Sequence, residues 1–240
     1  MKSNTKLPSV SIIIPAYNEE DNIYASVKSV LKAVNNNVKN YEIIVVDDGS
    51  TDGTENILRN MAKANKKIKI VKNIQNMGGG EAFKRGIEKA SNEYTSGFPG
   101  DNDMSWQSLK ELLLSSQKAD LVSSYMINPG KRSLWRRGVS RLFVMLLNLI
   151  FNLNLKYYNG FFICKTKLLK NMQLYSGGVT LLAEVKIRLI KKGASFMEIP
   201  FEHTGRQHGN SKAFTLKNIQ QTFLSMLRIA GDIYLWRIYK

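Results

Sequence analysis

The chain has 240 residues and 43% of them are hydrophobic, so it is long enough to bury a sizeable core and too apolar to be intrinsically disordered. Lys and Arg number 35 against 19 Asp and Glu, and the net charge of +16 predicts an anionic partner: nucleic acid, an acidic lipid or a phosphorylated substrate. The single cysteine, Cys164, excludes an intrachain disulfide and fits a reducing compartment.

The first half of the chain alternates between two kinds of hydrophobic pattern. Runs of β-branched residues predict strands, and apolar residues at helical spacing predict helices. In chain order, the predicted elements are strand 10–15, helix 21–34, strand 41–48, helix 51–65, strand 68–73 and helix 78–90. This alternation favours a mostly parallel sheet flanked by helices, in an α/β layer fold.

The second half is less regular. Its predicted elements are strand 120–125, helix 133–153, strand 157–165, helix 177–193, strand 195–201 and an amphipathic, basic tail at 214–240. There is no internal repeat and no clear linker, so we expect residues 1–240 to form a single domain.

The longest apolar segment, 142–155, is too short to cross a membrane. As a helix it would extend roughly 21 Å, less than a ~30 Å hydrocarbon core, and three Asn interrupt it. We expect neither a transmembrane helix nor a signal peptide. Segments of about 133–155 and 214–240 are instead expected to lie on an anionic membrane surface. Packing of both helices on the domain is the alternative.

Four polar turns follow predicted strands: PAYNEE, DDGSTDGT, NMGGGEA and PGDND. In an open α/β sheet, ligands bind beyond the carboxyl ends of the strands. We therefore expect these four turns to meet at one edge of the sheet and to form the functional site there.

The turns after the second and third strands each allow two interpretations. DDGSTDGT can simply cap a helix, or Asp48 can accept the ring N–H of a nucleotide base while Tyr17 lies against that base. NMGGGEA can be a plain connection between a strand and a helix, or Gly78 and Gly80 can let the backbone approach a ligand closely.

Asp101 and Asp103 form a D-x-D pair, which by itself is most often a solvated turn. At a strand end that faces the other turns, the pair is suited to Mg²⁺ or Mn²⁺, which prefer carboxylate and phosphate oxygens. Further along, Arg206 and Lys212 can belong to an ordinary basic loop, or can neutralise a departing nucleoside diphosphate.

Taken in order, the motifs resemble those of family 2 glycosyltransferases of GT-A fold, in particular dolichyl-phosphate mannose synthase and bacterial polyprenyl-phosphate sugar transferases. The motifs are VSIIIPAYNEEDNI, IIVVDDGSTDGT, NMGGGEAFKRG, DND, GFF and IPFEHTGRQHGNSK. The resemblance implies that the nucleoside contacts are Pro15, Tyr17, Glu19 and Asp48. It also implies that Asp101 and Asp103 bind the metal, with Asp103 as the preferred direct ligand, and that Arg206 and Lys212 hold phosphates.

The predicted reaction is therefore inverting, metal-dependent transfer of a sugar from a UDP- or GDP-linked donor to a dolichyl or undecaprenyl phosphate. We expect the protein to be cytoplasmic and peripheral on the inner face of the membrane. A sugar-hydroxyl acceptor in surface polysaccharide synthesis is the alternative, and it would need a carboxylate base. Glu184 is the candidate base, with an exposed helix acid as the other interpretation. A basic nucleic-acid-binding protein is a remote third class, and we expect no nucleic acid partner because no such motif is present.

Overall fold

The computed structural model describes residues 7–35, 37–128, 134–178, 180–202, 204 and 216–235. Its first half contains β1 (Val10–Ala16), α1 (Ile23–Val34), β2 (Tyr41–Asp47), α2 (Thr54–Ala64), β3 (Ile68–Lys72), α3 (Gly79–Lys89), β4 (Tyr94–Gly97) and α4 (Trp106–Leu114). The second half contains β5 (Leu121–Met126), α5 (Leu134–Phe151), β6 (Phe162–Lys165), α6 (Thr166–Lys170), α7 (Thr180–Lys191), β7 (Phe196–Phe201), α8 (Leu216–Ala230) and a π-helical turn, η2 (Gly231–Leu235).

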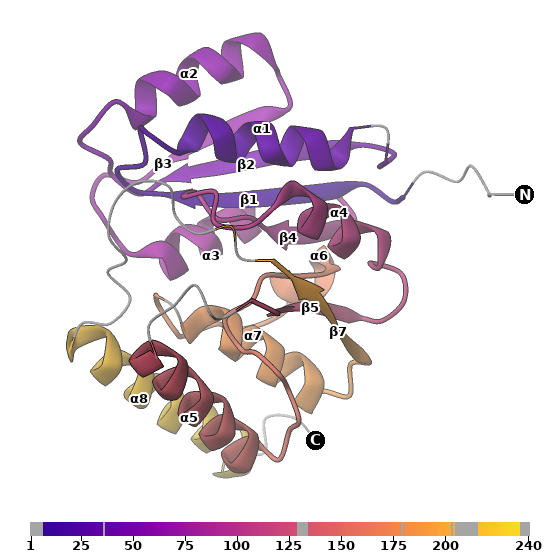
Figure 1. The fold of residues 1–240 in the computed structure, drawn as a ribbon, viewed down its shortest axis with the longest axis vertical. Helices are drawn as coiled ribbons and strands as arrows, with labels where there is room; N and C mark the ends of the chain where they lie inside the picture. Colours follow the sequence, from indigo (N-terminus) through magenta and orange to yellow (C-terminus); the bar gives the residue numbers. More distant parts are fainter. Residues whose placement is uncertain are drawn as a thin grey trace, which may run out of the picture.

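The strands of the described residues form one seven-stranded sheet in the order β3-β2-β1-β4-β6-β5-β7. Figure 1 shows β1 to β4 in the upper part of the molecule and β5 and β7 below them. Strands β1 to β4 are parallel to one another, and β5 is parallel to β7. Only β6 runs antiparallel to its neighbours, β4 and β5. The predicted α/β fold with a mostly parallel sheet is confirmed. Because β6 is reversed, its first residue lies at the edge where the parallel strands end.

Both faces of the sheet are buried under helices. Successive side chains of a strand point to opposite faces, so Ile12 and Ile14 of β1 pack under α1, α2 and α4, whereas Ile13 packs under α3, α6 and α7. This double coverage explains the almost continuous hydrophobic runs of β1 and β2, which show no alternation with polar residues.

A third cluster joins α5, α7 and α8 at the lower end of the molecule (Figure 1). Helix α5 contributes Leu147 and Phe151, and α8 contributes Met226 and Ile229. Most other apolar side chains of α5 and α8 remain exposed. Among the described residues, no helix combines the length and the apolar composition that a membrane span needs.

Some helix and strand boundaries differ from the predicted ranges, because turns and helix caps determine where these elements begin. Helix α2 begins at Thr54 rather than at residue 51, because the carboxylate of Asp52 accepts the Thr54 N–H at 3.0 Å and keeps residues 50–53 in the turn. Strand β4 and helix α4 have no counterpart among the predicted ranges. Strand β4 has only four residues, YTSG, and α4 starts at a side-chain cap in which Ser105 accepts the Ser108 N–H at 3.2 Å.

Candidate active site

The turns that follow β1 and β2 are joined by reciprocal hydrogen bonds. The Asn18 Oδ1 accepts the Thr51 N–H at 2.9 Å, and the Asn18 N–H donates to the Ser50 hydroxyl at 3.0 Å. Two residues further on, Glu20 Oε2 accepts the Gly53 N–H at 2.7 Å. Asn18 has a φ of 53°, a left-handed conformation that Asn tolerates better than most residues. These contacts fix the two turns side by side.

Three predicted nucleoside contacts lie on or just after β1. Pro15 and Tyr17 are half-buried at the end of the strand. Glu19, the third of these predicted contacts, is engaged with α1: its carboxylate accepts the Asn22 side-chain amide at 2.8 Å and its carbonyl accepts the Ile23 N–H at 2.7 Å. Glu19 therefore also organises the start of α1.

Asp48 is nearly fully buried and holds the loop that follows β3. Its Oδ1 accepts the Asn73 amide at 2.5 Å and the Met77 N–H at 3.0 Å, and its Oδ2 accepts the Gly78 N–H at 2.7 Å. An ionised carboxylate offers about four acceptor positions, so Oδ2 retains capacity for one more donor. This arrangement is compatible with the N–H of a nucleotide base.

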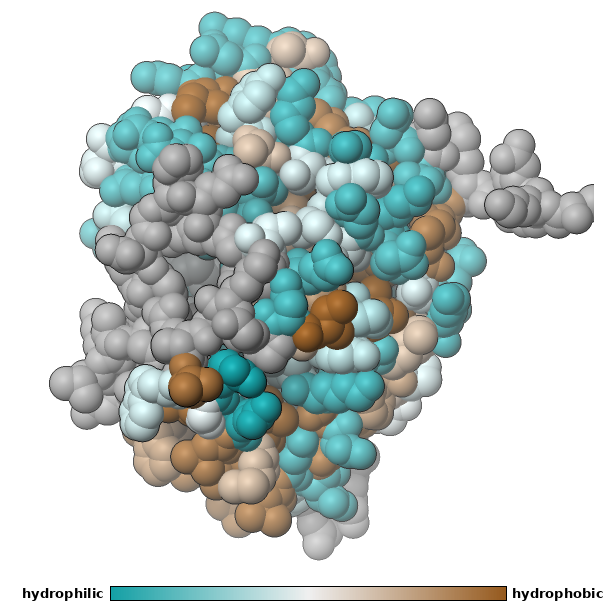
Figure 2. Space-filling model, in the orientation of Figure 1, coloured by the Kyte–Doolittle hydropathy of each residue, from teal (hydrophilic) through white to brown (hydrophobic). Residues whose placement is uncertain are grey.

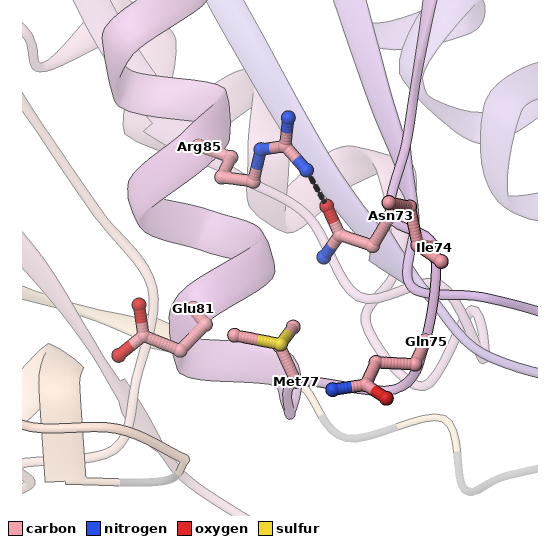
Figure 3. A pocket seen from close by; sticks show the side chains of 6 residues that line it. All are labelled: Asn73, Ile74, Gln75, Met77, Glu81 and Arg85. Carbon is pink, nitrogen blue, oxygen red and sulfur yellow. Dashed lines mark hydrogen bonds between the residues drawn. The ribbon is translucent and has the colours of Figure 1, made fainter.

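A pocket of about 420 Å³ lies between this loop and α3 (Figure 3). Inside it, the Arg85 guanidinium donates to Asn73 Oδ1, the same side chain whose amide nitrogen binds Asp48. Neither Asn73 nor Arg85 is among the predicted site residues, although Asn73 directly follows β3, where site residues are expected. The lining residues are Asn73, Ile74, Gln75, Met77, Glu81 and Arg85.

The glycines of the NMGGGEA turn serve different purposes. Gly78 has a φ of +94°, which strongly favours glycine, and its N–H is engaged by Asp48. Gly80 faces the protein itself, because a Cβ there would overlap the backbone of Gly177 and Gly178. Glycine is therefore required at position 80 because the backbone of a neighbouring loop approaches it closely. The sequence had suggested close approach to a ligand instead.

The D-x-D turn follows β4 and rests on the end of β1. A Cβ on Gly100 would lie 2.5 Å from the Pro15 carbonyl oxygen, so only glycine permits this approach. Asp101 and Asp103 are half-buried, and the Asp103 N–H points to Asp101 Oδ1 at 3.4 Å. Together with the contacts above, this places the turns after β1, β2, β3 and β4 along one edge of the sheet, as predicted.

Thr204 connects this turn to the basic motif near the C-terminus. Its N–H donates to the Asp103 carbonyl at 3.0 Å and its hydroxyl donates to the Asn102 carbonyl at 3.1 Å. Thr204 is two residues from Arg206. Arg206 and Lys212 themselves lie outside the described residues.

The D-x-D residues fit Mg²⁺ or Mn²⁺ by their chemistry. Both metals take hard oxygen ligands, often one or two carboxylates completed by substrate phosphates and water. In the part of the chain that the structure describes, no group of three or more His, Cys, Asp or Glu side chains gathers to hold a metal. A metal at Asp101 and Asp103 would thus depend on the phosphates of a substrate.

Glu184 is fully buried on α7 and belongs to an ion-pair network. Its Oε2 accepts the Ser176 N–H at 2.7 Å, and its Oε1 accepts Arg188 Nε at 2.7 Å. Arg188 in turn donates to Asp232 Oδ2 at 2.6 Å. The interpretation of Glu184 as an exposed helix acid is therefore wrong. The Glu184 carboxylate is shielded from solvent and ion-paired with Arg188, and it holds the loop of Ser176 against α7.

Lys186 of α7 is a further buried ionisable group, and it is not among the predicted site residues. Burial lowers the pKa of Lys186 to about 7, and the negative charge of Glu198 only partly opposes this effect. Its Nζ donates to the Tyr157 carbonyl oxygen at 3.3 Å. Lys186 thereby supports the segment that leads into β6.

Comparisons with known proteins agree with this geometry. The family model described as glycosyl transferase family 2 matches residues 11–175, more than half of the chain. An uncharacterised protein of Methanocaldococcus jannaschii is 28% identical over 199 residues, which cover 78% of this chain and 84% of that protein.

An undecaprenyl-phosphate 4-deoxy-4-formamido-L-arabinose transferase of Edwardsiella ictaluri is 27% identical over 214 residues. The match covers 88% of this chain but only 64% of that transferase. Among solved structures, glucosyl-3-phosphoglycerate synthase from Mycobacterium tuberculosis, in complex with Mn²⁺, UDP and glucosyl-3-phosphoglycerate, has a TM-score of 0.70 at 23% identity, covering 93% of this chain and 80% of the other. That likeness is one of fold. The chain belongs to glycosyl transferase family 2 and is a glycosyltransferase of GT-A fold.

Proposed function

We propose that this enzyme transfers a sugar from a nucleotide diphosphate sugar to a polyprenyl phosphate, with inversion at the anomeric carbon. The observation that carries the proposal is the position of Asp101 and Asp103 at the carboxyl end of β4, beside the turns that follow β1, β2 and β3. The name of the Edwardsiella relative supports the class of acceptor.

The nucleoside would bind at the turns after β1 and β2, with Tyr17 against the base and Asp48 Oδ2 accepting a base N–H. Asp101 and Asp103 would hold Mg²⁺ or Mn²⁺ together with the diphosphate. The bound ion would neutralise negative charge that develops on the departing nucleoside diphosphate. Thr204 fixes the D-x-D turn, and we assign phosphate contacts to Arg206 and Lys212, which follow Thr204 in the chain.

A phosphate acceptor is consistent with the buried ion pair of Glu184. In the reaction, an anionic phosphate oxygen of the acceptor forms the new bond to the anomeric carbon, and the bond from that carbon to the nucleoside diphosphate breaks. The attacking oxygen carries no proton, so no strong base is required. A sugar-hydroxyl acceptor would need a base, and the ion-paired Glu184 is poorly suited to that role.

The polyprenyl chain would remain in a membrane, and α5 and α8 offer a surface for it. We call this surface the apolar face. The exposed fractions of its residues range from 43% to 78%, and Figure 2 shows apolar side chains gathered over this lower end. The apolar face comprises Leu142, Met145, Leu146, Leu149, Ile150, Phe223, Leu224 and Leu227.

Basic residues accompany the apolar face. Arg141 of α5 and Arg228 of α8 are exposed, and the chain has a net charge of +16. Apolar side chains in the headgroup region and basic side chains at anionic lipid together favour peripheral binding. We place the enzyme on the cytoplasmic face of the membrane, because anionic lipids give that face its negative surface potential.

A reconstituted assay tests the proposal. Vesicles of phosphatidylglycerol with undecaprenyl phosphate are mixed with the enzyme, Mn²⁺ and a panel of UDP- and GDP-linked sugars. We expect flotation with the vesicles, release from them in high salt, and a glycolipid product. Leu149→Asp and Leu227→Asp should abolish flotation, whereas Leu114→Asp, which alters an exposed leucine on α4, should not. Transfer to a soluble glycan by an enzyme that never floats would contradict the lipid acceptor.

A further inference from the structure

Five buried side-chain oxygens of the described residues lack a hydrogen-bond partner, and two of them belong to asparagine amides near the D-x-D turn. Among the described residues, two side-chain amides have such an oxygen, those of Asn102 and Asn159. Asn102 is the middle residue of the D-x-D turn. Asn159 stands just before β6, whose reversed direction brings its first residue to the same edge. Buried polar atoms in proteins are almost always paired, so these two exceptions require an explanation.

The register between β4 and β6 indicates where Asn159 lies along this edge. Ser96 is opposite Ile163, and in an antiparallel pair each step forward on one strand is a step backward on the other. Continued past the strand ends, this register brings Asn159 to the level of Gly100, which immediately precedes Asp101. By this extension of the register, Asn159 would lie beside the D-x-D turn, on the side away from β1.

The order of the strands then predicts where the nucleoside, the diphosphate and the sugar of the donor would lie along the edge of the sheet. The nucleoside site that we propose lies over the ends of β2 and β1, and the diphosphate site lies over the end of β4. The next strand in the sheet is β6, about 4.8 Å further on. A sugar attached to the second phosphate would thus lie over the start of β6, where Asn159 is.

The segment around Asn159 is held firmly. A Cβ on Gly160 would overlap the Ser124 carbonyl oxygen, so the backbone is pressed against β5. Before it, the Lys156 N–H donates to the Glu198 carboxylate at 3.0 Å. The backbone is anchored on both sides of Asn159, so the Asn159 side chain starts from a fixed backbone position, as a preorganised ligand contact requires.

We infer that Asn159 is a specificity-determining residue whose Oδ1 accepts a hydrogen bond from a hydroxyl group of the donor's sugar. This inference rests on the proposed function, since it needs a nucleotide sugar laid across the sheet edge. A sugar hydroxyl is a donor and an amide oxygen is an acceptor, so the contact would satisfy the oxygen that folding leaves unpaired. In a site shielded from water, such a bond is worth more than at the surface.

The test compares Asn159→Ala and Asn159→Leu with Asn154→Ala, which changes an exposed asparagine in the same segment. Release of UDP or GDP from a panel of nucleotide sugars gives kcat/KM, and calorimetry gives the affinity for UDP and GDP. For the preferred donor, both Asn159 variants should lose about 10-fold in kcat/KM, the usual loss for one hydrogen bond. Affinity for the sugar-free nucleotides should stay within about 2-fold of the wild type.

Donors whose sugar lacks one hydroxyl group show whether Asn159 contacts that sugar directly or only supports the structure. The wild type should lose about 10-fold with one particular analogue, and Asn159→Ala should lose almost nothing more with that analogue, because the contact is already gone. Equal losses in wild type and variant on every analogue would overturn the inference, as would a parallel fall in affinity for UDP and GDP. A wild-type enzyme that turns over no nucleotide sugar would instead refute the proposed function, before any variant is made.

Discussion

The guanidinium of Arg188 donates to the carboxylate of Glu184 at 2.7 Å, and both side chains are almost completely buried on α7. Asp232 of η2 contacts the same guanidinium at 2.6 Å. Arg188 therefore forms ion pairs with two acids from different parts of the chain. A buried ion pair of this kind contributes little in itself, but loss of one partner leaves an uncompensated charge.

Replacement of Glu184 by Gln should destabilise the fold. We expect the free energy of unfolding to fall by about 3 kcal/mol or more, because Arg188 loses one of its two carboxylates. Urea denaturation measures this change, and Glu88→Gln, on the exposed side of α3, is the control. If Glu184 were also the catalytic base, turnover by the folded variant would fall by at least about 100-fold as well.

Replacement of Asp103 by Asn should remove turnover while the fold remains intact. The change deletes a charged oxygen ligand, and we expect a loss of about 100-fold or more, with a smaller loss for Asp101→Asn. Product formation should stop in EDTA and return with Mn²⁺ or Mg²⁺. Glu111→Gln on α4 controls for a change of surface charge. Undiminished turnover in EDTA would show that the D-x-D pair has no catalytic metal.

Replacement of Asp48 by Ala should weaken nucleotide binding by about 1–3 kcal/mol. The variant loses the acceptor for the base and also frees the Met77 and Gly78 amides that Asp48 holds. Calorimetric titration with UDP and GDP gives the affinity. Asp52→Ala, which removes the carboxylate that accepts the Thr54 N–H in the same turn, should reduce stability without weakening nucleotide binding. Equal affinities for Asp48→Ala and wild type would place the nucleotide elsewhere.

Lys186 should make stability depend on pH. Burial lowers its pKa to about 7 in the folded protein, whereas the ordinary value is 10.5. Between these values the unfolded chain binds more protons than the folded one, so this residue makes stability rise with pH by up to about 1.4 kcal/mol per unit. Burial of Lys186 therefore destabilises the fold below pH 10.5, and this destabilisation grows until pH falls to about 7.

Urea titrations at pH 7, 8 and 9 test this dependence. Lys186→Met should be more stable than the wild type near pH 7, and the difference should shrink as pH rises. Lys118→Met changes an exposed lysine and should follow the wild type at every pH. A constant difference between Lys186→Met and wild type would show that Lys186 keeps its proton in both states.

Sequence patterns predicted the sheet and the edge that carries the site, because both follow from local periodicity and from strand–helix alternation. They did not predict the partners of Asp48, since Asn73 lies 25 residues away and reaches Asp48 only once β2 and β3 pair. The burial of Glu184 was also missed. Its Arg188 partner is visible at helical spacing, but Asp232 comes from the far end of the chain.

The contact between Gly80 and Gly178 also links local opening of the loop before α7 to local opening at the start of α3. Gly178 belongs to the loop whose Ser176 amide is held by Glu184, and Gly80 lies in the first turn of α3. Opening of this loop removes a neighbour from the start of α3 and a hydrogen bond from Glu184 at once. The amides of these two regions should therefore exchange with solvent as a single cooperative unit rather than as independent segments.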